Sequence, residues 1–183
     1  MAAPLTTNFK SKHKSHEFLY TQPFRVEPNN ISDMQSLLKS QEPGSFGSFI
    51  FESLQGYGGI FPMKKGYIKE AAALIRGQGG IVISDEVQAG LGRLGESFWG
   101  CQLPENDIIP DMIIFGKGIS SGTVPLSGVV MKSSIANEVA SEKMWISTYG
   151  NHAVASAAAL EVLKIIEETD TQANVKELGK VMR

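Results

Sequence analysis

Short apolar runs that alternate with amphipathic stretches constrain the fold of this chain more than any other feature of its sequence. Strands are predicted at Ser48–Leu54, Gly80–Ser84, Asp111–Phe115 and Leu126–Met131. Apolar residues at consecutive positions are typical of strands that are buried on both faces in a parallel sheet. We therefore predict an α/β fold with a mostly parallel sheet flanked by helices.

Helical periodicity is clearest between the first two of these strands. In the predicted helix Lys65–Arg76, the side chains of Ile68, Ala71, Ala72 and Ile75 share one face, and glycines follow its end. The other predicted helices are Ser32–Lys39 with Asn30 as its N-cap, Ser133–Glu142, Ala153–Glu168, and one that begins near Thr171–Asn174.

The first quarter of the chain is mixed and polar, and four prolines interrupt it before residue 45. We interpret residues 1–47 as a poorly defined N-terminal segment and residues 48–183 as part of a single domain. The length of 183 residues is enough for one domain with a sizeable core.

Composition excludes several classes of function. The net charge is -2 and the isoelectric point is about 5.9, with no basic run to neutralise a row of phosphates, so no nucleic-acid partner is expected. No apolar run reaches the length that spans a bilayer, and Met1–Thr7 lack the pattern of a targeting segment. A single cysteine, Cys101, rules out an internal disulfide, and we predict no metal site.

Chemically useful residues follow the predicted strands at their carboxyl ends, where parallel sheets bind ligands. Asp85 comes after one strand, Lys117 lies between two glycines after another, and Glu52 lies near the end of a third. A lysine in such a place is either a surface residue of a loop or an amine that forms a Schiff base with an aldehyde. A nearby carboxylate suits a pyridinium nitrogen, but spacing alone leaves both interpretations open.

The sequence around Asp85 and Lys117 favours the Schiff-base interpretation of the lysine. The stretches GGIVISDEVQAGLGRLGESFWG (79–100), PDMIIFGKGISSGTVPLSGVVM (110–131) and STYGNHAVASAAALEVL (147–163) resemble class-III aminotransferases. These are enzymes that use pyridoxal 5'-phosphate (PLP) and have a large domain of fold type I. The resemblance therefore implies that this chain is the central part of that domain.

The resemblance also implies roles for single residues. Lys117 would form the Schiff base with PLP and transfer protons during the reaction. Asp85 would pair with the pyridine nitrogen, Val87 would pack on one face of the ring, and Gln88 would hydrogen-bond the phenolic oxygen of the ring. Thr148 would reach the cofactor phosphate of a neighbouring subunit, which implies a homodimer or homotetramer.

Four other positions have more than one interpretation. Glu52 matches an active-site-rim glutamate that would contact substrate, but a carboxylate that caps a nearby loop explains it equally well. We interpret Arg93 as a structural residue in the loop after Asp85 rather than a substrate contact, and His152 as a structural hydrogen-bonding partner at the subunit interface rather than a catalytic base. Trp99 is expected to belong to the core.

Three functions remain open. The first is an aminotransferase that moves an amino group from an amino acid to an oxo acid such as glyoxylate or pyruvate. The second is a PLP-dependent phospho-lyase acting on a phosphorylated amino alcohol or phosphohydroxylysine, and Gly118, where those enzymes have proline, favours the first. The third is a truncated, non-enzymatic product that only dimerises.

The last two predictions concern the length of the chain and its location in the cell. Family members are more than twice as long, so we expect a fragment or truncated form that binds PLP weakly and is inactive by itself. The resemblance implies a mitochondrial protein, with the cytoplasm as the alternative.

Overall fold

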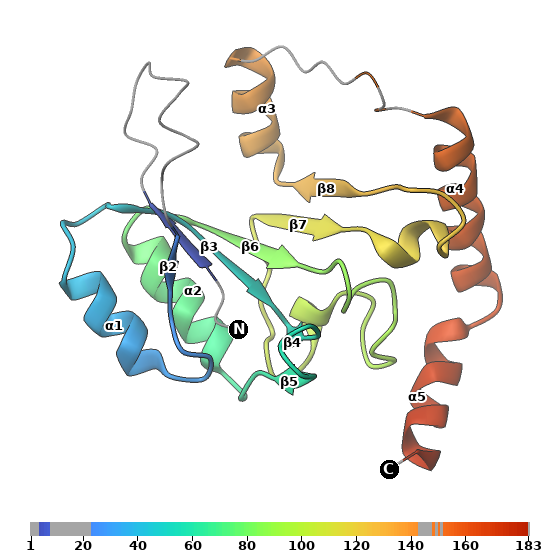
Figure 1. Cartoon of the computed structure of the whole chain (residues 1–183), viewed down its shortest axis with the longest axis horizontal. Helices are drawn as coiled ribbons and strands as arrows, with labels where there is room; N and C mark the ends of the chain where they lie inside the picture. The colour runs from blue at the N-terminus through green and yellow to red at the C-terminus, as the bar shows by residue number, and fades with distance from the viewer. Residues whose placement is uncertain (1–3, 8–22, 143–147, 149, 151, 183) are drawn as a thin grey trace. The chain divides into compact units, whose positions relative to one another are not determined.

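A computed structural model of the chain describes residues 4–7, 23–142, 148, 150 and 152–182 (Figure 1). The chain divides into two compact units. The first comprises the residues up to 84 together with 101–110, and the second comprises 85–100 together with the residues from 111 onward.

The first unit contains strands β1 (Pro4–Thr7), β2 (Phe24–Arg25) and β3 (Phe46–Glu52), and also β6 (Ile81–Asp85) next to β3, except that the last residue of β6 belongs to the second unit. The order of strands is β2-β1-β3-β6, and β1 pairs antiparallel with both β2 and β3. The sheet is therefore mixed, and its two N-terminal strands come from the segment 1–47, which was expected to be poorly defined and in which no strand was predicted.

Two helices accompany these strands. Helix α1 (Ile31–Lys39) begins at Asn30, whose side chain accepts a hydrogen bond from the backbone N–H of Asp33 at 3.2 Å, as a good N-cap does. Helix α2 (Tyr67–Gly77) lies beside α1 (Figure 1). The predicted apolar face of α2 is confirmed, because all four of its members are buried: Ile68, Ala71, Ala72 and Ile75.

Aromatic and aliphatic side chains fill the core of the first unit. Phe49 and Phe51 stack with ring centroids 5.6 Å apart, and Met34 of α1 is fully buried. Cys101 is also buried, with 1% of its surface exposed. A short antiparallel hairpin of β4 (Leu54–Gln55) and β5 (Phe61–Pro62) follows β3.

In the second unit, β7 (Met112–Phe115) pairs antiparallel with β8 (Gly128–Met131), with Met112 opposite Met131. β8 starts two residues later than predicted. Lys117–Ser120 forms a short 3-10 helix, η3, directly after β7. Trp99, expected in the core, is half-buried and lies against Phe98 and Phe115, with centroid distances of 4.9 and 6.2 Å.

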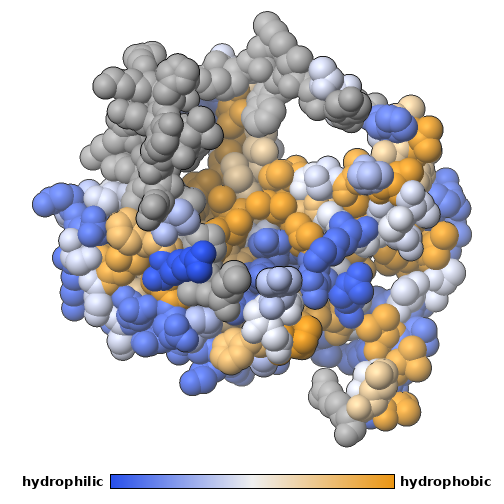
Figure 2. Space-filling view, in the orientation of Figure 1, coloured by the Kyte–Doolittle hydropathy of each residue, from blue (hydrophilic) through white to orange (hydrophobic). Residues whose placement is uncertain are grey.

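Three helices complete this unit: α3 (Ser133–Glu142), α4 (Ala153–Glu168) and α5 (Thr171–Val181). The bounds of α3 and α4 agree with the prediction. α4 packs against η3, whereas α5 buries none of its residues. Figure 2 shows apolar surface over α4 and α5, where Leu160, Leu178 and other apolar side chains are exposed. Among the described helices, none has both the length and the apolar character needed to cross a bilayer.

Candidate active site

Four of the predicted cofactor residues lie in the second unit, on two segments that hydrogen bonds join. Asp85, Val87 and Gln88 follow β6, and Lys117 is the first residue of η3 after β7. The backbone N–H of Glu86 donates to the carbonyl oxygen of Ile114 in β7 at 2.8 Å. This bond holds the segment after β6 beside the strand that leads to the lysine.

Lys117 stands at a sharp turn of the backbone. Its φ angle is 42°, in the left-handed region that side chains other than glycine rarely adopt, and its side chain is exposed. Its Nζ donates a hydrogen bond of 2.8 Å to Oε1 of Gln88. The structure thus brings together two residues that sequence analysis assigned to one cofactor site.

A turn of its own backbone orients the Asp85 carboxylate. Asp85 is half-buried, and its Oδ1 accepts a hydrogen bond of 3.1 Å from the backbone N–H of Val87. Within the part of the chain that the structure describes, the other carboxylate oxygen has no hydrogen-bonding partner. The Val87 side chain lies beside Gly116, where an added Cβ would be 3.6 Å from Val87 Cγ1. One oxygen of Asp85 is therefore fixed, and the other can accept a further donor.

Lys117 lines a hollow of about 300 Å³ that sequence analysis missed. The loop after η3 forms its wall, and two short hydrogen bonds hold this loop. Ser120 Oγ donates to the carbonyl oxygen of Val124 at 2.6 Å, and Thr123 Oγ1 donates to that of Ser120 at 2.7 Å. The turn residues Gly122 and Pro125 were the signal in the sequence, since glycine and proline this close to Lys117 mark a loop beside the lysine.

Glu52 and Thr148 are not linked to these residues by any described contact. In the first unit, Oε2 of Glu52 accepts a hydrogen bond from the backbone N–H of Gly56 at 3.1 Å, as the loop-capping interpretation expects. Thr148 is exposed, and its neighbours 149 and 151 lie outside the described residues. Their predicted contacts with substrate and with phosphate stay predictions.

His152 and Arg93 have positions that fit structural roles. His152 is the N-cap of α4, and its Nδ1 accepts from the backbone N–H of Ala155 at 3.4 Å. Arg93 is exposed, and its guanidinium would lie 3.8 Å from a Cβ added at Gly118. The loop after Asp85 therefore approaches the backbone next to Lys117.

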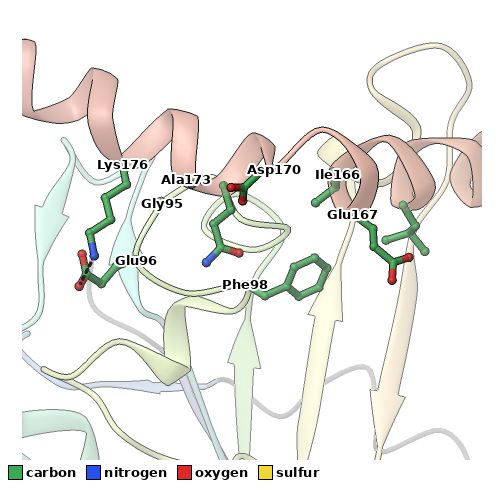
Figure 3. A pocket seen from close by; sticks show the side chains of 10 residues that line it. Gly95, Glu96, Phe98, Ile166, Glu167, Asp170, Ala173 and Lys176 are labelled. Atoms are coloured by element: carbon green, nitrogen blue, oxygen red, sulfur yellow. Dashed lines mark hydrogen bonds and ion pairs between the residues drawn. The ribbon is translucent and has the colours of Figure 1, made fainter.

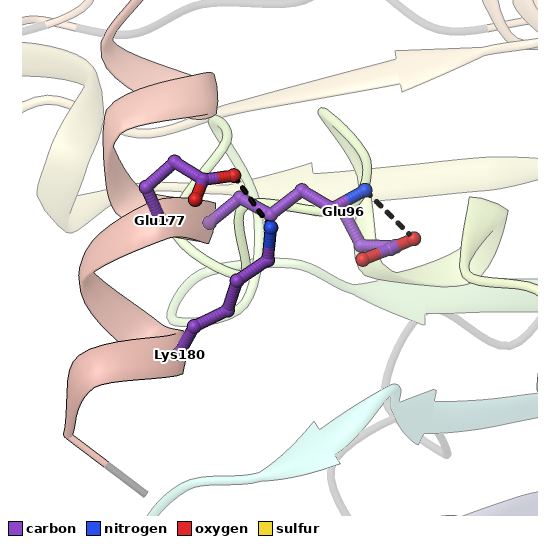
Figure 4. A network of polar contacts seen from close by, with 4 residues as sticks. Glu96, Glu177 and Lys180 are labelled. Atoms are coloured by element: carbon purple, nitrogen blue, oxygen red, sulfur yellow. Dashed lines mark hydrogen bonds and ion pairs between the residues drawn. The ribbon is translucent and has the colours of Figure 1, made fainter.

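A larger hollow of about 650 Å³ lies in the second unit away from Lys117 (Figure 3). Phe98 and Ile166 supply apolar walls, and polar residues of the 95–98 segment and of α5 surround them. At its rim, Lys176 Nζ lies 3.2 Å from Glu96 Oε1 (Figure 4). None of the predicted site residues lines this hollow. The described residues hold no group of three or more His, Cys, Asp or Glu placed for a metal ion.

Comparisons with known proteins agree on one family. The sequence model described as Aminotransferase class-III matches residues 4–183. Human alanine–glyoxylate aminotransferase 2, mitochondrial, is 37% identical over 152 residues, which are 83% of this chain and 29% of that protein. Ethanolamine-phosphate phospho-lyase homolog 1 of Caenorhabditis elegans is 31% identical over an alignment of 183 positions, which covers 97% of this chain and 39% of that protein.

Solved structures give the same result. Taurine:2-oxoglutarate aminotransferase from Bifidobacterium kashiwanohense, in complex with PLP and glutamate, has a TM-score of 0.77 and 32% identity, over 83% of this chain and 34% of that one. Ornithine aminotransferase from Toxoplasma gondii has a TM-score of 0.75 and 28% identity, over 85% of this chain and 35% of that one. In each of these comparisons the chain spans less than two-fifths of the other protein.

Proposed function

The chain belongs to the class-III aminotransferase family, and from this premise we propose that it forms the central part of a PLP-dependent aminotransferase site. The expected α/β fold of fold type I is confirmed by the transaminase neighbours. In the proposed reaction, an amino group moves from an amino acid to an oxo acid such as glyoxylate or pyruvate. The observation that carries the proposal is the Lys117 amine, which lies 2.8 Å from the Gln88 amide in the same unit as Asp85.

The residues fit the cofactor that the comparisons indicate, pyridoxal phosphate. When bound, PLP withdraws electrons from the substrate carbon that carries the amino group. Lys117 offers a primary amine to its aldehyde, and the unpaired oxygen of Asp85 suits a protonated ring nitrogen. Val87 offers an apolar surface to the ring, and Gln88 an amide to its oxygen.

The chain's own groups would divide the remaining work. The Lys117 amine would hold and move the proton, and Gln88 would keep this amine in reach through their hydrogen bond. The turn at Val87 would keep the Asp85 carboxylate in one orientation. We propose that Thr148 contacts the phosphate bound by a second subunit in a homodimer or homotetramer, and that Glu52 borders the substrate.

A phospho-lyase is the second candidate, because the Caenorhabditis elegans relative matches 97% of this chain. Gly118 supports the aminotransferase. A Cβ at this position would lie 3.3 Å from Leu91 Cδ1, so the Leu91 side chain would have to shift by a few tenths of an ångström to admit a larger residue. We propose a mitochondrial location from the name of the human relative, with the cytoplasm as the alternative.

The first experiment is to add PLP to the purified chain, trap the adduct with borohydride and map the modified peptide. We expect an adduct at Lys117 that Lys117→Ala abolishes and that Lys164→Ala, which removes an exposed lysine of α4, leaves unchanged. An adduct at another lysine would overturn the assignment of Lys117. Absence of any adduct would count against the proposal that this chain by itself builds a site for PLP.

The second experiment separates the two reactions. In a preparation in which the site is completed, we expect amino transfer from alanine to glyoxylate and no release of phosphate from a phosphorylated amino alcohol, and the reverse result would favour the phospho-lyase. In an active preparation, Asp85→Asn should reduce kcat much more than it raises the dissociation constant for PLP. Asp85 is proposed to act on the electronics of the bound cofactor, so equal losses would contradict that role.

A further inference from the structure

Glu86 is a buried carboxylate between two proposed cofactor residues, and the proposed function gives it no task. Only 1% of its surface is exposed. Removing a carboxylate from water is unfavourable unless hydrogen bonds replace the lost hydration. A buried glutamate next to Asp85 therefore requires a structural reason.

Three hydrogen bonds show which parts of the chain Glu86 connects. Its backbone N–H donates to the carbonyl oxygen of Ile114 in β7 at 2.8 Å, and its own carbonyl oxygen accepts from the N–H of Gly90 at 3.0 Å. Its side-chain Oε2 accepts from the backbone N–H of Gly100 at 2.8 Å. Glu86 is thus bonded to strand β7, to Gly90 in the turn after β6, and to Gly100, 14 residues further along the chain, where the loop closes.

The loop from 86 to 100 carries the residue that holds the lysine. Gln88 lies near its start and accepts the hydrogen bond from Lys117. The loop is tightly packed at Gly90, where an added Cβ would lie 2.8 Å from both the Glu86 carbonyl oxygen and the ring of Trp99. Closing such a loop has an entropic cost, which a short charge-assisted hydrogen bond offsets.

We infer that Glu86 is a positioning residue: its carboxylate closes the 86–100 loop at Gly100 and so sets where Gln88 stands relative to the Lys117 amine. This inference rests on the proposed function, because it assigns the Gln88–Lys117 pair to the cofactor site. Glu86 itself touches neither the amine nor any reacting atom in this arrangement.

Hydrogen exchange tests the closure without any cofactor. Glu86→Ala should speed exchange of peptides covering 87–100 about tenfold, the effect expected for a lost charge-assisted hydrogen bond, and leave α2 unchanged. Glu86→Gln keeps an acceptor oxygen and should give about a threefold effect. The matched control is Glu96→Gln, which removes the same charge from an exposed position in the same loop and should leave exchange at the native rate.

A double-mutant cycle tests whether Glu86 acts through Gln88. We expect Glu86→Ala to raise the PLP concentration for half-maximal trapping at Lys117 about tenfold in the native background, and less than twofold in a Gln88→Ala background. A residue that only stabilised the fold would give the same factor in both backgrounds. If Glu86→Ala does not fold, Glu86→Gln takes its place with a proportionally smaller factor.

The two tests fail in distinguishable ways. If the native chain forms no adduct at Lys117, the proposed function fails, and the exchange experiment still decides whether Glu86 closes the loop. If the adduct forms but 87–100 exchanges at the native rate in Glu86→Ala, the inference is overturned while the proposed function stands. Equal factors in the two backgrounds would overturn it as well.

Discussion

Among the described residues, nearly all of the large apolar side chains that are buried belong to the first unit, whereas the second unit leaves many of its own exposed. Ile68 and Ile75 of α2 are 0% exposed, while Leu160 of α4 is 57% exposed and α5 buries no residue. The proposed site belongs to the second unit, where hydrogen bonds orient the side chains of Asp85, Gln88 and Lys117. Packing therefore stabilises one region, and polar contacts order the other.

The largest expected difference between the two regions comes from apolar truncation. Ile75→Ala should lower the free energy of unfolding by about 3 kcal/mol, because it empties space in a closely packed core. Leu160→Ala, its match in the second unit, should change it by less than about 0.5 kcal/mol because the side chain is largely exposed. Urea unfolding curves measure both, and equal losses would remove the contrast.

The second prediction concerns the stability of the first unit at alkaline pH, which should depend on Tyr67 of α2. Burial, with the charges of Asp33 and Glu27 adding to it, raises the pKa of Tyr67 from 10.0 to about 12. Below pH 10 both the folded and unfolded states keep the phenolic proton, and between pH 10 and 12 the unfolded state loses it first. Stability should therefore fall across this window.

Tyr67→Phe cannot ionise and is the matched variant for this test. Urea unfolding at pH 9 and pH 11 should show a smaller loss of stability in Tyr67→Phe than in the native chain. An identical loss in both proteins would contradict the raised pKa.

In the second unit, the ion pair between Lys132 and Asp111 should contribute less than the packed core of the first. Lys132 Nζ lies 2.6 Å from Oδ1 of Asp111, whose side chain is only 10% exposed. Lys132→Met should lower the free energy of unfolding by about 1 kcal/mol, as expected for a half-buried charge-assisted hydrogen bond. Lys164→Met, which breaks an exposed pair with Glu161, should have almost no effect. A loss for Lys132→Met as large as that for Ile75→Ala would break the comparison.

The smallest expected effect is at the start of α4. His152→Ala removes the acceptor for the Ala155 N–H and should destabilise the helix by about 0.5 kcal/mol, the lower end for an N-cap. Hydrogen exchange in the first turn of α4 measures this change. His152→Asn supplies another side-chain acceptor and should restore the native exchange rate. Equal exchange rates in His152→Ala and His152→Asn would rule out the cap.

Periodicity and strand-end position predicted most of the architecture. The bounds of α3 and α4 and the buried face of α2 follow from residue spacing alone. The strands β1 and β2 could not be predicted, because they are short and depend on pairing with residues far along the chain. For the same reason, the antiparallel direction of β8 is set by its pairing with β7 and leaves no mark on its composition.

The residues of the candidate site could be proposed from the sequence, but the contacts between them could not. The strand-end rule and the family resemblance selected Asp85 and Lys117, which the structure places in one unit. The left-handed turn at Lys117 and the bond from Glu86 to Gly100 could not be predicted, since both depend on the closed shape of a loop. His152 was expected to form structural hydrogen bonds, and the structure gives it a specific one as a helix cap.

The single cysteine makes the first unit its own reporter of opening. Because Cys101 is buried and no other thiol exists in the sequence, a thiol reagent can reach it only when that part of the unit opens. The rate at which a thiol reagent labels Cys101 in the native chain therefore measures how often this part of the first unit opens, and no engineered probe is needed. Measured with and without PLP, the labelling rate shows whether filling the proposed site slows this opening. The first unit contains none of the four cofactor residues proposed in the second unit, Asp85, Val87, Gln88 and Lys117.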